Sequence, residues 1–216
     1  NDAVTDLSWV DKRFQLKTVQ GEYLTERVVI ATGTKPVTFP DVSVDSNAKE
    51  RVFYEVRPLS AIQDQTIMIA GSGDAAFDYA LNLSRHNRVN ILIRGKGTKC
   101  LPLLKARTLQ SPAITINYNT AVQAVTKIQG GGLVIECLTP SGKGQFSGDF
   151  LIGALGRTPN LGFVRQAILD DRSQLEREGR LYFIGDVTNG IYRQTAIAVG
   201  QGIQCAMRIY RFFEEK

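Results

Sequence analysis

The chain has little of the material from which metal sites and hydrolytic sites are built. Its 216 residues include a single histidine, His86, and three cysteines, Cys100, Cys137 and Cys205. The cysteines lie far apart and form no Cys-x-x-Cys pair, so neither a zinc site nor a local redox dithiol is expected. They are interpreted as buried thiols without chemistry, and His86 as a surface residue that caps a helix. We therefore predict no metal.

Long apolar runs are also missing. No stretch approaches the roughly 20 residues that a membrane helix requires, and residues 1–6 lack the basic and apolar regions of a signal peptide. The net charge of +5 is spread along the sequence, without the basic runs and interleaved aromatics that follow a nucleic-acid backbone. We expect a cytoplasmic protein with no membrane or nucleic-acid partner, whose positive charge holds a phosphorylated small molecule.

The most informative segment that is present is an apolar run ending in a glycine turn. Residues 66–70 are expected to form a buried parallel strand, and the Gly-x-Gly-x-x-Ala turn after it opens a helix with one apolar face. A second apolar run, residues 89–93, completes a β-α-β unit. Because backbone N–H groups and the positive end of the helix meet at such a turn, it suits a pyrophosphate. The residues assigned to it are Gly71, Ser72, Gly73, Asp74, Ala75 and Ala76. The alternative is a tight turn without a ligand.

The end of the next strand indicates which nicotinamide cofactor fits. An acidic side chain there accepts a hydrogen bond from a ribose 2′-hydroxyl, whereas cations there favour a 2′-phosphate. This sequence has Arg94 and Lys96, with Lys99 nearby and no carboxylate. Arg94 can form a two-pronged hydrogen bond to a phosphate, so NADP(H) is favoured over NAD(H). The alternative is a solvated basic loop.

The rest of the chain is expected to form strands, turns and two helices. An antiparallel meander over 13–31 leads to a strand at 28–31, and a linker is expected from 36 to about 46. A short helix is expected over 101–110. Further strands are expected at 113–118, 121–128, 132–138, 150–155 and 181–184, with a hairpin turn at 130–132 and an irregular segment at 161–180. A closing helix over 195–213 is expected to bury Val199, Ile203, Ala206 and Tyr210.

Four segments, taken in order, resemble the two-dinucleotide-domain flavoproteins of the low-molecular-weight thioredoxin reductase type. They are Ala31-Thr32-Gly33, the turn at 71–76, Gly156-Arg157-Thr158-Pro159-Asn160, and Gly185-Asp186-Val187 followed by Ile191-Tyr192-Arg193-Gln194. The resemblance covers essentially the whole chain. It implies an α/β fold with two Rossmann-like domains plus antiparallel meander segments. The implied boundaries are 1–40 and 154–216 for the two FAD-domain segments and 41–153 for the NADP-binding domain.

Two departures from this family limit what the resemblance implies. Its Cys-x-x-Cys positions hold Tyr54, Glu55, Val56 and Arg57 here, so the chain is more similar to the thioredoxin-reductase-like ferredoxin–NADP reductases. The family's first Gly-x-Gly-x-x-Gly turn, which holds the ADP half of FAD, has no counterpart before Ala31. The FAD-type domain is therefore expected to be incomplete, with a missing N-terminal segment and exposed apolar surface.

The resemblance also implies an FAD site at two strand ends. Its residues are Thr32, Gly33, Gly185, Asp186, Arg193, Gln194 and Thr195. Asp186 corresponds to a carboxylate that bonds the ribityl chain, although a turn or N-cap residue is the alternative. Arg157 corresponds to a residue at the crossing between domains, where it is expected to approach the NADP ribose or phosphate. The alternative is that this segment only forms a hinge, which Pro159 stiffens.

The function implied is hydride transfer from NADPH to FAD, with electrons passing on to an unidentified small-molecule or protein acceptor. No acid–base residue is nominated, because the cofactors carry out the redox chemistry. A homodimer is expected. The alternative is a non-catalytic NADP-binding module without flavin.

Overall fold

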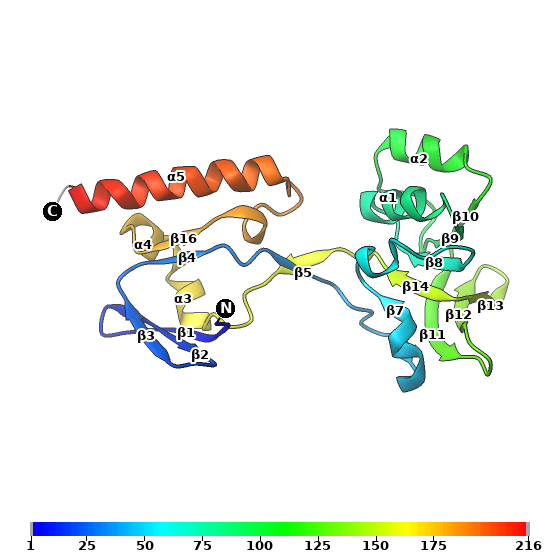
Figure 1. The fold of residues 1–216 in the computed structure, drawn as a ribbon, viewed down its shortest axis with the longest axis horizontal. Helices are drawn as coiled ribbons and strands as arrows, with labels where there is room; N and C mark the ends of the chain where they lie inside the picture. The colour runs from blue at the N-terminus through cyan, green and yellow to red at the C-terminus, as the bar shows by residue number, and fades with distance from the viewer. Residues whose placement is uncertain (1, 215–216) are drawn as a thin grey trace. The chain divides into compact units, whose positions relative to one another are not determined.

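A computed structural model describes residues 2–214, and the chain divides into two compact units. Unit 1 comprises Asn1–Lys35 and Thr158–Lys216, and unit 2 is the continuous segment Pro36–Arg157. The chain passes between the units twice (Figure 1). Each passage contains a short strand, β5 (Thr34–Pro36) or β15 (Arg157–Pro159), and the two strands pair with each other.

Unit 2 is built around a parallel sheet with the strand order β10-β9-β8-β14-β7. Side chains alternate between its faces. Ile67 and Ile69 therefore pack in the cluster that contains Phe77 of helix α1 (Asp74–Leu83), whereas Met68 packs in a second cluster on the opposite face. The strands are β7 (Val52–Phe53), β8 (Thr66–Ala70), β9 (Arg88–Leu92), β10 (Ile114–Asn117) and β14 (Phe150–Gly153). The predicted β-α-β unit is confirmed.

Helices and a second sheet complete unit 2. Helices α1 (Asp74–Leu83) and α2 (Pro102–Leu109) follow β8 and β9. The second sheet has the order β13-β12-β11-β6, with strands β6 (Ser43–Val44), β11 (Ala121–Lys127), β12 (Leu133–Thr139) and β13 (Gly142–Gly148). The glycines at 130–132 have positive φ and form the turn between β11 and β12, as predicted. Two 3₁₀ turns, η1 (Ser46–Arg51) and η2 (Arg57–Leu59), flank β7.

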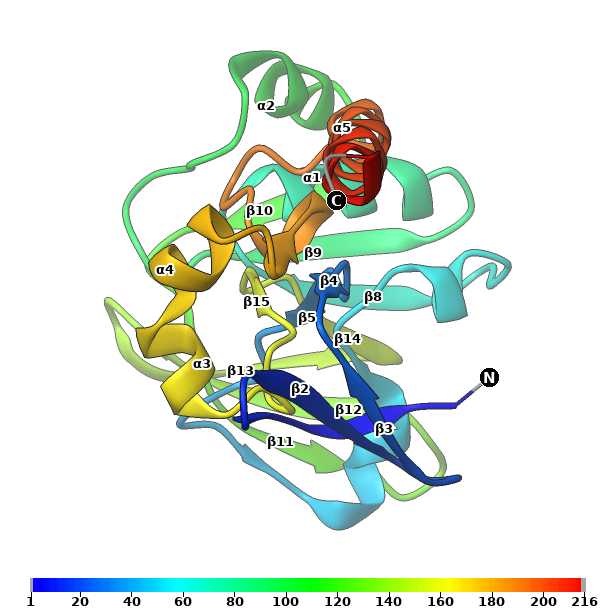
Figure 2. The same cartoon turned by 90° about the vertical axis from the view of Figure 1, so that its left-hand side faces the viewer.

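Unit 1 combines a meander with a narrow parallel sheet. Strands β1 (Val4–Val10), β2 (Arg13–Thr18) and β3 (Glu22–Thr25) are antiparallel neighbours, with β2 in the middle. Figure 2 shows β2 and β3 side by side. Strands β4 (Val28–Ile30) and β16 (Leu181–Phe183) form a parallel pair. Helices α3 (Gln166–Asp170) and α4 (Arg172–Arg177), the turn η3 (Gly185–Val187) and helix α5 (Thr195–Glu214) complete the unit. Its core includes Leu7, Phe14, Ile30 and Leu181.

Two predictions of local structure were wrong, and one strand was not predicted. The predicted linker at 36–46 contains β6, which pairs with β11 because Val44 packs into the core beneath it. The segment 142–148 is a strand despite three glycines, since its backbone pairs with β12 along its whole length. The segment expected to be irregular contains α3 and α4, which bury Ile168 and Leu175. These helices are too short to show a helical period in the sequence.

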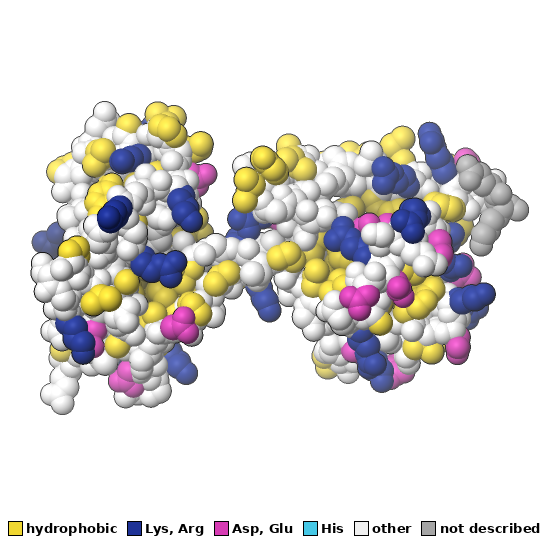
Figure 3. All heavy atoms as spheres, turned by 180° about the vertical axis from the view of Figure 1, so that it is seen from behind, with side chains coloured by type: hydrophobic (Ala, Val, Ile, Leu, Met, Phe, Trp, Pro, Cys, Tyr) yellow, Lys and Arg dark blue, Asp and Glu magenta, His cyan; other side chains and the backbone are white. Residues whose placement is uncertain are grey.

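The buried face of α5 was also predicted wrongly. Val199, Ile203 and Tyr210 are 56%, 59% and 62% exposed, and Ala206 is exposed as well. The helix instead turns Cys205, 5% exposed, toward β16. An apolar stripe identifies a face that favours burial, but the two strands of this sheet offer a surface to only one side of α5. Apolar side chains reach the surface of unit 1 along this helix (Figure 3). Within residues 2–214, no helix is both long and apolar enough to cross a bilayer.

Candidate functional site

The glycine turn lies where β8 ends beside β9 and β14. The N–H of Gly71 donates to Leu92 at 3.1 Å, and the N–H of Ala154 donates to Ala70 at 2.8 Å. A β-carbon on Gly71 would lie 2.5 Å from the carbonyl oxygen of Ala154 and 3.1 Å from the β-carbon of Ala76. Any side chain at position 71 would therefore force β8, β14 and α1 apart. Gly73 is different, because a β-carbon there would meet nothing within 4 Å.

Free donors gather at this turn. In the described part of the chain, the backbone N–H groups of Ser72, Gly73, Asp74 and Ala75 make no hydrogen bond. The first intrahelical bond of α1 runs instead from Ala76 to the carbonyl of Gly73. Unbonded amides at a helix start, next to open space at Gly73, make a suitable phosphate cradle. The predicted set 71–76 thus fits the pyrophosphate of a dinucleotide.

The basic loop after β9 is fixed against the turn. The N–H of Lys99 donates to the carbonyl of Ser72 at 2.7 Å, and the N–H of Leu101 donates to the Asp74 carboxylate at 2.7 Å. Arg94 and Lys96 are exposed. Among residues 2–214, neither forms an ion pair with a carboxylate. Both cations therefore stay at the strand end where a 2′-phosphate is expected, while Asp74 holds the loop in place.

Arg157 lies beyond the carboxyl end of β14 and forms an ion pair with Glu55. Tyr54, the residue before Glu55, lies against Gly153, where a β-carbon would be 2.9 Å from the tyrosine ring. The Tyr54 hydroxyl accepts a hydrogen bond from the N–H of Phe39 at 3.3 Å. No local sequence pattern around residues 54 and 55 indicates this packing.

A second glycine-lined site lies within unit 1. A cavity of about 400 Å³ brings together six of the seven residues assigned to FAD, which are Gly33, Gly185, Asp186, Arg193, Gln194 and Thr195. The seventh, Thr32, is adjacent in the chain, and its hydroxyl donates to the carbonyl of Asn160 at 2.8 Å. Gly33 and Gly185 have φ of +63° and +72°, a region that favours glycine. The start of α5 adds its positive end to this cavity.

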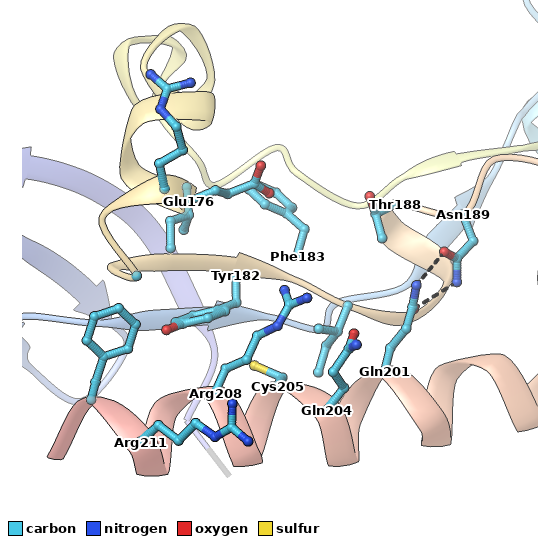
Figure 4. Close-up of a pocket in the computed structure, with 15 residues that line it drawn as sticks. Glu176, Tyr182, Phe183, Thr188, Asn189, Gln201, Gln204, Cys205, Arg208 and Arg211 are labelled. Carbon is cyan, nitrogen blue, oxygen red and sulfur yellow. Dashed lines mark hydrogen bonds between the residues drawn. The ribbon is translucent and has the colours of Figure 1, made fainter. Parts of the chain in front are cut away.

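The Gly185–Asp186 turn is held by a residue that the sequence did not indicate. The Gln201 side chain of α5 accepts from the N–H of Gly185 at 2.7 Å. It also forms two hydrogen bonds with the Asn189 amide, at 3.0 and 2.9 Å (Figure 4). Gln204, one helical turn further on, lines the same side of α5 and forms no hydrogen bond with any residue of the described range 2–214. Asp186 is half-buried and lines the cavity of about 400 Å³.

The three cysteines are free thiols that differ in burial. Cys137 and Cys205 are buried and Cys100 is half-buried, with no disulfide among them. Burial raises the pKa of Cys137 to about 11 and also raises the pKa of Cys205. Because the thiolate is the reactive form, the two buried cysteines are poor nucleophiles at neutral pH.

Comparison with known proteins agrees with this geometry. The family model described as pyridine nucleotide-disulphide oxidoreductase matches residues 1–178. The chain belongs to this family. The ferredoxin–NADP reductase of Wolbachia pipientis wMel is 26% identical, and the match covers 77% of this chain and 54% of that protein. The thioredoxin reductase of Peptoclostridium litorale is 24% identical, with 99% and 73% covered.

The fold of this family member is also found in solved structures. The crystal structure of Lactococcus lactis thioredoxin reductase in its FR conformation superposes with a TM-score of 0.81 at 21% identity. That match covers all of this chain and 75% of the reductase. The expected α/β fold of the thioredoxin reductase type is thereby confirmed. The chain spans about half the length of the ferredoxin–NADP reductases that it matches.

Proposed function

We propose that this chain acts in an NADPH-dependent, FAD-containing oxidoreductase without a dithiol. The observation that carries the proposal is the group of unbonded amides of Ser72, Gly73, Asp74 and Ala75 beside Arg94 and Lys96. These donors suit a pyrophosphate, and the two cations suit a 2′-phosphate. The names of the relatives, ferredoxin–NADP reductase and thioredoxin reductase, are consistent with this cofactor.

The two units have different tasks in this proposal. Unit 2 binds NADPH through the turn at 71–76, Arg94 and Lys96, with Arg157 at the end of β14. Unit 1 holds FAD against Asp186, Arg193 and Gln194, where the N-terminus of α5 favours negative charge on a reduced flavin. When bound, the two cofactors supply a hydride donor and a hydride acceptor. The protein residues bind and orient them.

The electron acceptor is proposed to be a small molecule or a protein. It is not a disulfide reduced through a Cys-x-x-Cys pair of this chain. Positions 54–57 contain no cysteine, and the chain's three cysteines lie elsewhere. The relatives' names include ferredoxin and thioredoxin, so a protein carrier is one candidate. A cytoplasmic location remains a prediction.

The predicted homodimer also remains a proposal. The exposed apolar face of α5, which includes Val199, Ile203, Met207, Tyr210 and Phe213, gives a second copy of the chain a surface to cover. Light scattering of the purified chain tests the dimer. Elution at the mass of a single 216-residue chain at micromolar concentration contradicts it.

A spectroscopic experiment tests the proposed function. We expect the purified protein, loaded with FAD, to be yellow and to lose the oxidised-flavin absorbance on anaerobic addition of NADPH. Colourless protein that takes up no FAD but binds NADPH supports the alternative, a non-catalytic NADP-binding module. Protein that binds neither cofactor contradicts both assignments.

A further inference from the structure

The order of strands in unit 2 defines two sides of the nucleotide crevice. From β8 the chain continues to β9 and β10 on one side of the sheet, whereas β14 and β7 lie on the other. Ligands of doubly wound sheets bind where the strand order reverses, at the carboxyl ends of the strands. This point is the boundary between β8 and β14, next to Gly71. A dinucleotide centred there has one half toward Arg94 and the other half toward β14.

The β14 side of this crevice ends in an ion pair. Arg157 donates to the carboxylate of Glu55, and the two side chains are 32% and 46% exposed. The segment that carries Glu55 is itself fixed, because Tyr54 packs closely on Gly153 and bonds to Phe39. Glu55 thus approaches Arg157 from a rigid support at the same strand end.

The charges of this ion pair also act on Tyr79 of α1. Burial raises the pKa of the Tyr79 hydroxyl, the negative charge of Glu55 raises it further, and Arg157 acts in the opposite direction. Both charges therefore act electrostatically on a side chain of the helix whose first turn carries the unbonded amides. Because Arg157 follows β14 in the chain, the ion pair lies on the β14 side of the crevice.

We propose that Glu55 is a positioning residue for the nicotinamide half of the dinucleotide. The inference rests on the proposed function. Glu55 holds the Arg157 guanidinium at the β14 side of the crevice, where it contacts the phosphate or ribose of that half. An exposed ion pair adds little to folding stability. Its effect is to restrict a long, flexible side chain before the ligand arrives, which improves binding by preorganisation.

Two probes separate the halves of the ligand. NADP⁺ carries both halves, whereas 2′,5′-ADP carries only the adenosine half with its 2′-phosphate. Isothermal titration of the full chain is expected to show Arg157→Gln weakening NADP⁺ binding about 10-fold, as for loss of a charged hydrogen bond, with 2′,5′-ADP binding changed less than about 2-fold. Glu55→Gln is expected to weaken NADP⁺ binding about 3-fold and, like Arg157→Gln, to change 2′,5′-ADP binding less than about 2-fold.

The double variant distinguishes positioning from an independent contact. If Glu55 acts through Arg157, then E55Q/R157Q binds NADP⁺ no more weakly than R157Q alone. The matched control is Glu50→Gln, which breaks the ion pair of Glu50 with Lys127 elsewhere in unit 2 and is expected to leave both probes unaffected.

Several results overturn the inference. They are unchanged NADP⁺ affinity in E55Q, equal losses for the two probes, or additive losses in the double variant. A parent protein that binds both probes, combined with any of these results, leaves the proposed function intact. A parent protein that binds neither probe overturns the proposed function as well.

Discussion

Gly71 and Ala154 approach each other so closely that a β-carbon on Gly71 would lie 2.5 Å from the Ala154 carbonyl oxygen. The contact joins the end of β8 to the residue after β14, two strands that are far apart in the chain and adjacent in the sheet. Glycine is therefore required at position 71 by the packing of the protein itself. At position 73 the space is open. In our proposal, glycine is needed there because the phosphate of the ligand approaches the backbone closely.

The two glycines of the turn should respond differently to alanine. Gly71→Ala is expected to lower the free energy of unfolding by about 1–3 kcal/mol, because the added methyl group overpacks the junction of β8 and β14. Gly73→Ala is expected to cost less than about 1 kcal/mol, since its φ of −94° suits any residue. The same change should weaken NADP⁺ binding about 10-fold by keeping phosphate away from the amides. Urea unfolding and titration calorimetry measure the two effects; similar unfolding free energies for both variants would contradict the distinction.

Arg94 should determine the preference between the nicotinamide cofactors. Changing Arg94 to Glu replaces a phosphate donor with a charge that repels the 2′-phosphate. We expect NADPH affinity to fall at least about 10-fold and NADH affinity to change less than about 3-fold, as measured by fluorescence titration. Arg107→Glu in α2, which reverses a charge elsewhere in unit 2, serves as the control. An equal loss of affinity for both cofactors after Arg94→Glu would contradict the assignment of Arg94 to the 2′-phosphate.

Gln201 and Gln204 offer a matched pair in α5. Gln201→Leu leaves the N–H of Gly185 and the Asn189 amide without partners, so it is expected to lower the free energy of unfolding by about 1–3 kcal/mol. It should also reduce the FAD content of the purified protein, because the turn with Asp186 loses its support. Gln204→Leu removes no recorded hydrogen bond and should stay within about 0.5 kcal/mol of the parent protein. Chemical denaturation and flavin absorbance provide the comparison, and equal effects of the two changes rule out the support role.

Cys137 makes stability depend on alkaline pH. Its pKa rises from the ordinary 9.0 to about 11 on burial, so the folded protein favours the neutral thiol. The neutral buried thiol therefore contributes fully to the free energy of unfolding below about pH 9, and this contribution is lost as the pH rises toward 11. We expect the free energy of unfolding to fall more steeply between pH 8.5 and about 10.5 in the parent protein than in Cys137→Ala. Identical slopes count against burial as the cause.

At pH 8, iodoacetamide should modify the half-buried Cys100 before Cys137.

Local pattern was sufficient for the nucleotide turn. The strand at 66–70, the helix opening at Asp74 and the strand after it are all present, because an apolar run, a glycine turn and one apolar helical face are each set by nearby residues. The short helices α3 and α4 were missed for the converse reason. They are stabilised by burial of Ile168 and Leu175 against strands distant in sequence.

The sequence by itself determined the glycine turns, the cations after β9 and the absence of a dithiol at positions 54–57, since residue identity and spacing carry that information. Only the tertiary structure decided which face of α5 is covered, that Gln201 supports Gly185, and that Glu55 meets Arg157. Each of these depends on segments that are remote along the chain and brought together by packing. A stripe of apolar residues or a single charged side chain specifies what can be buried or paired, and the fold alone supplies the partner.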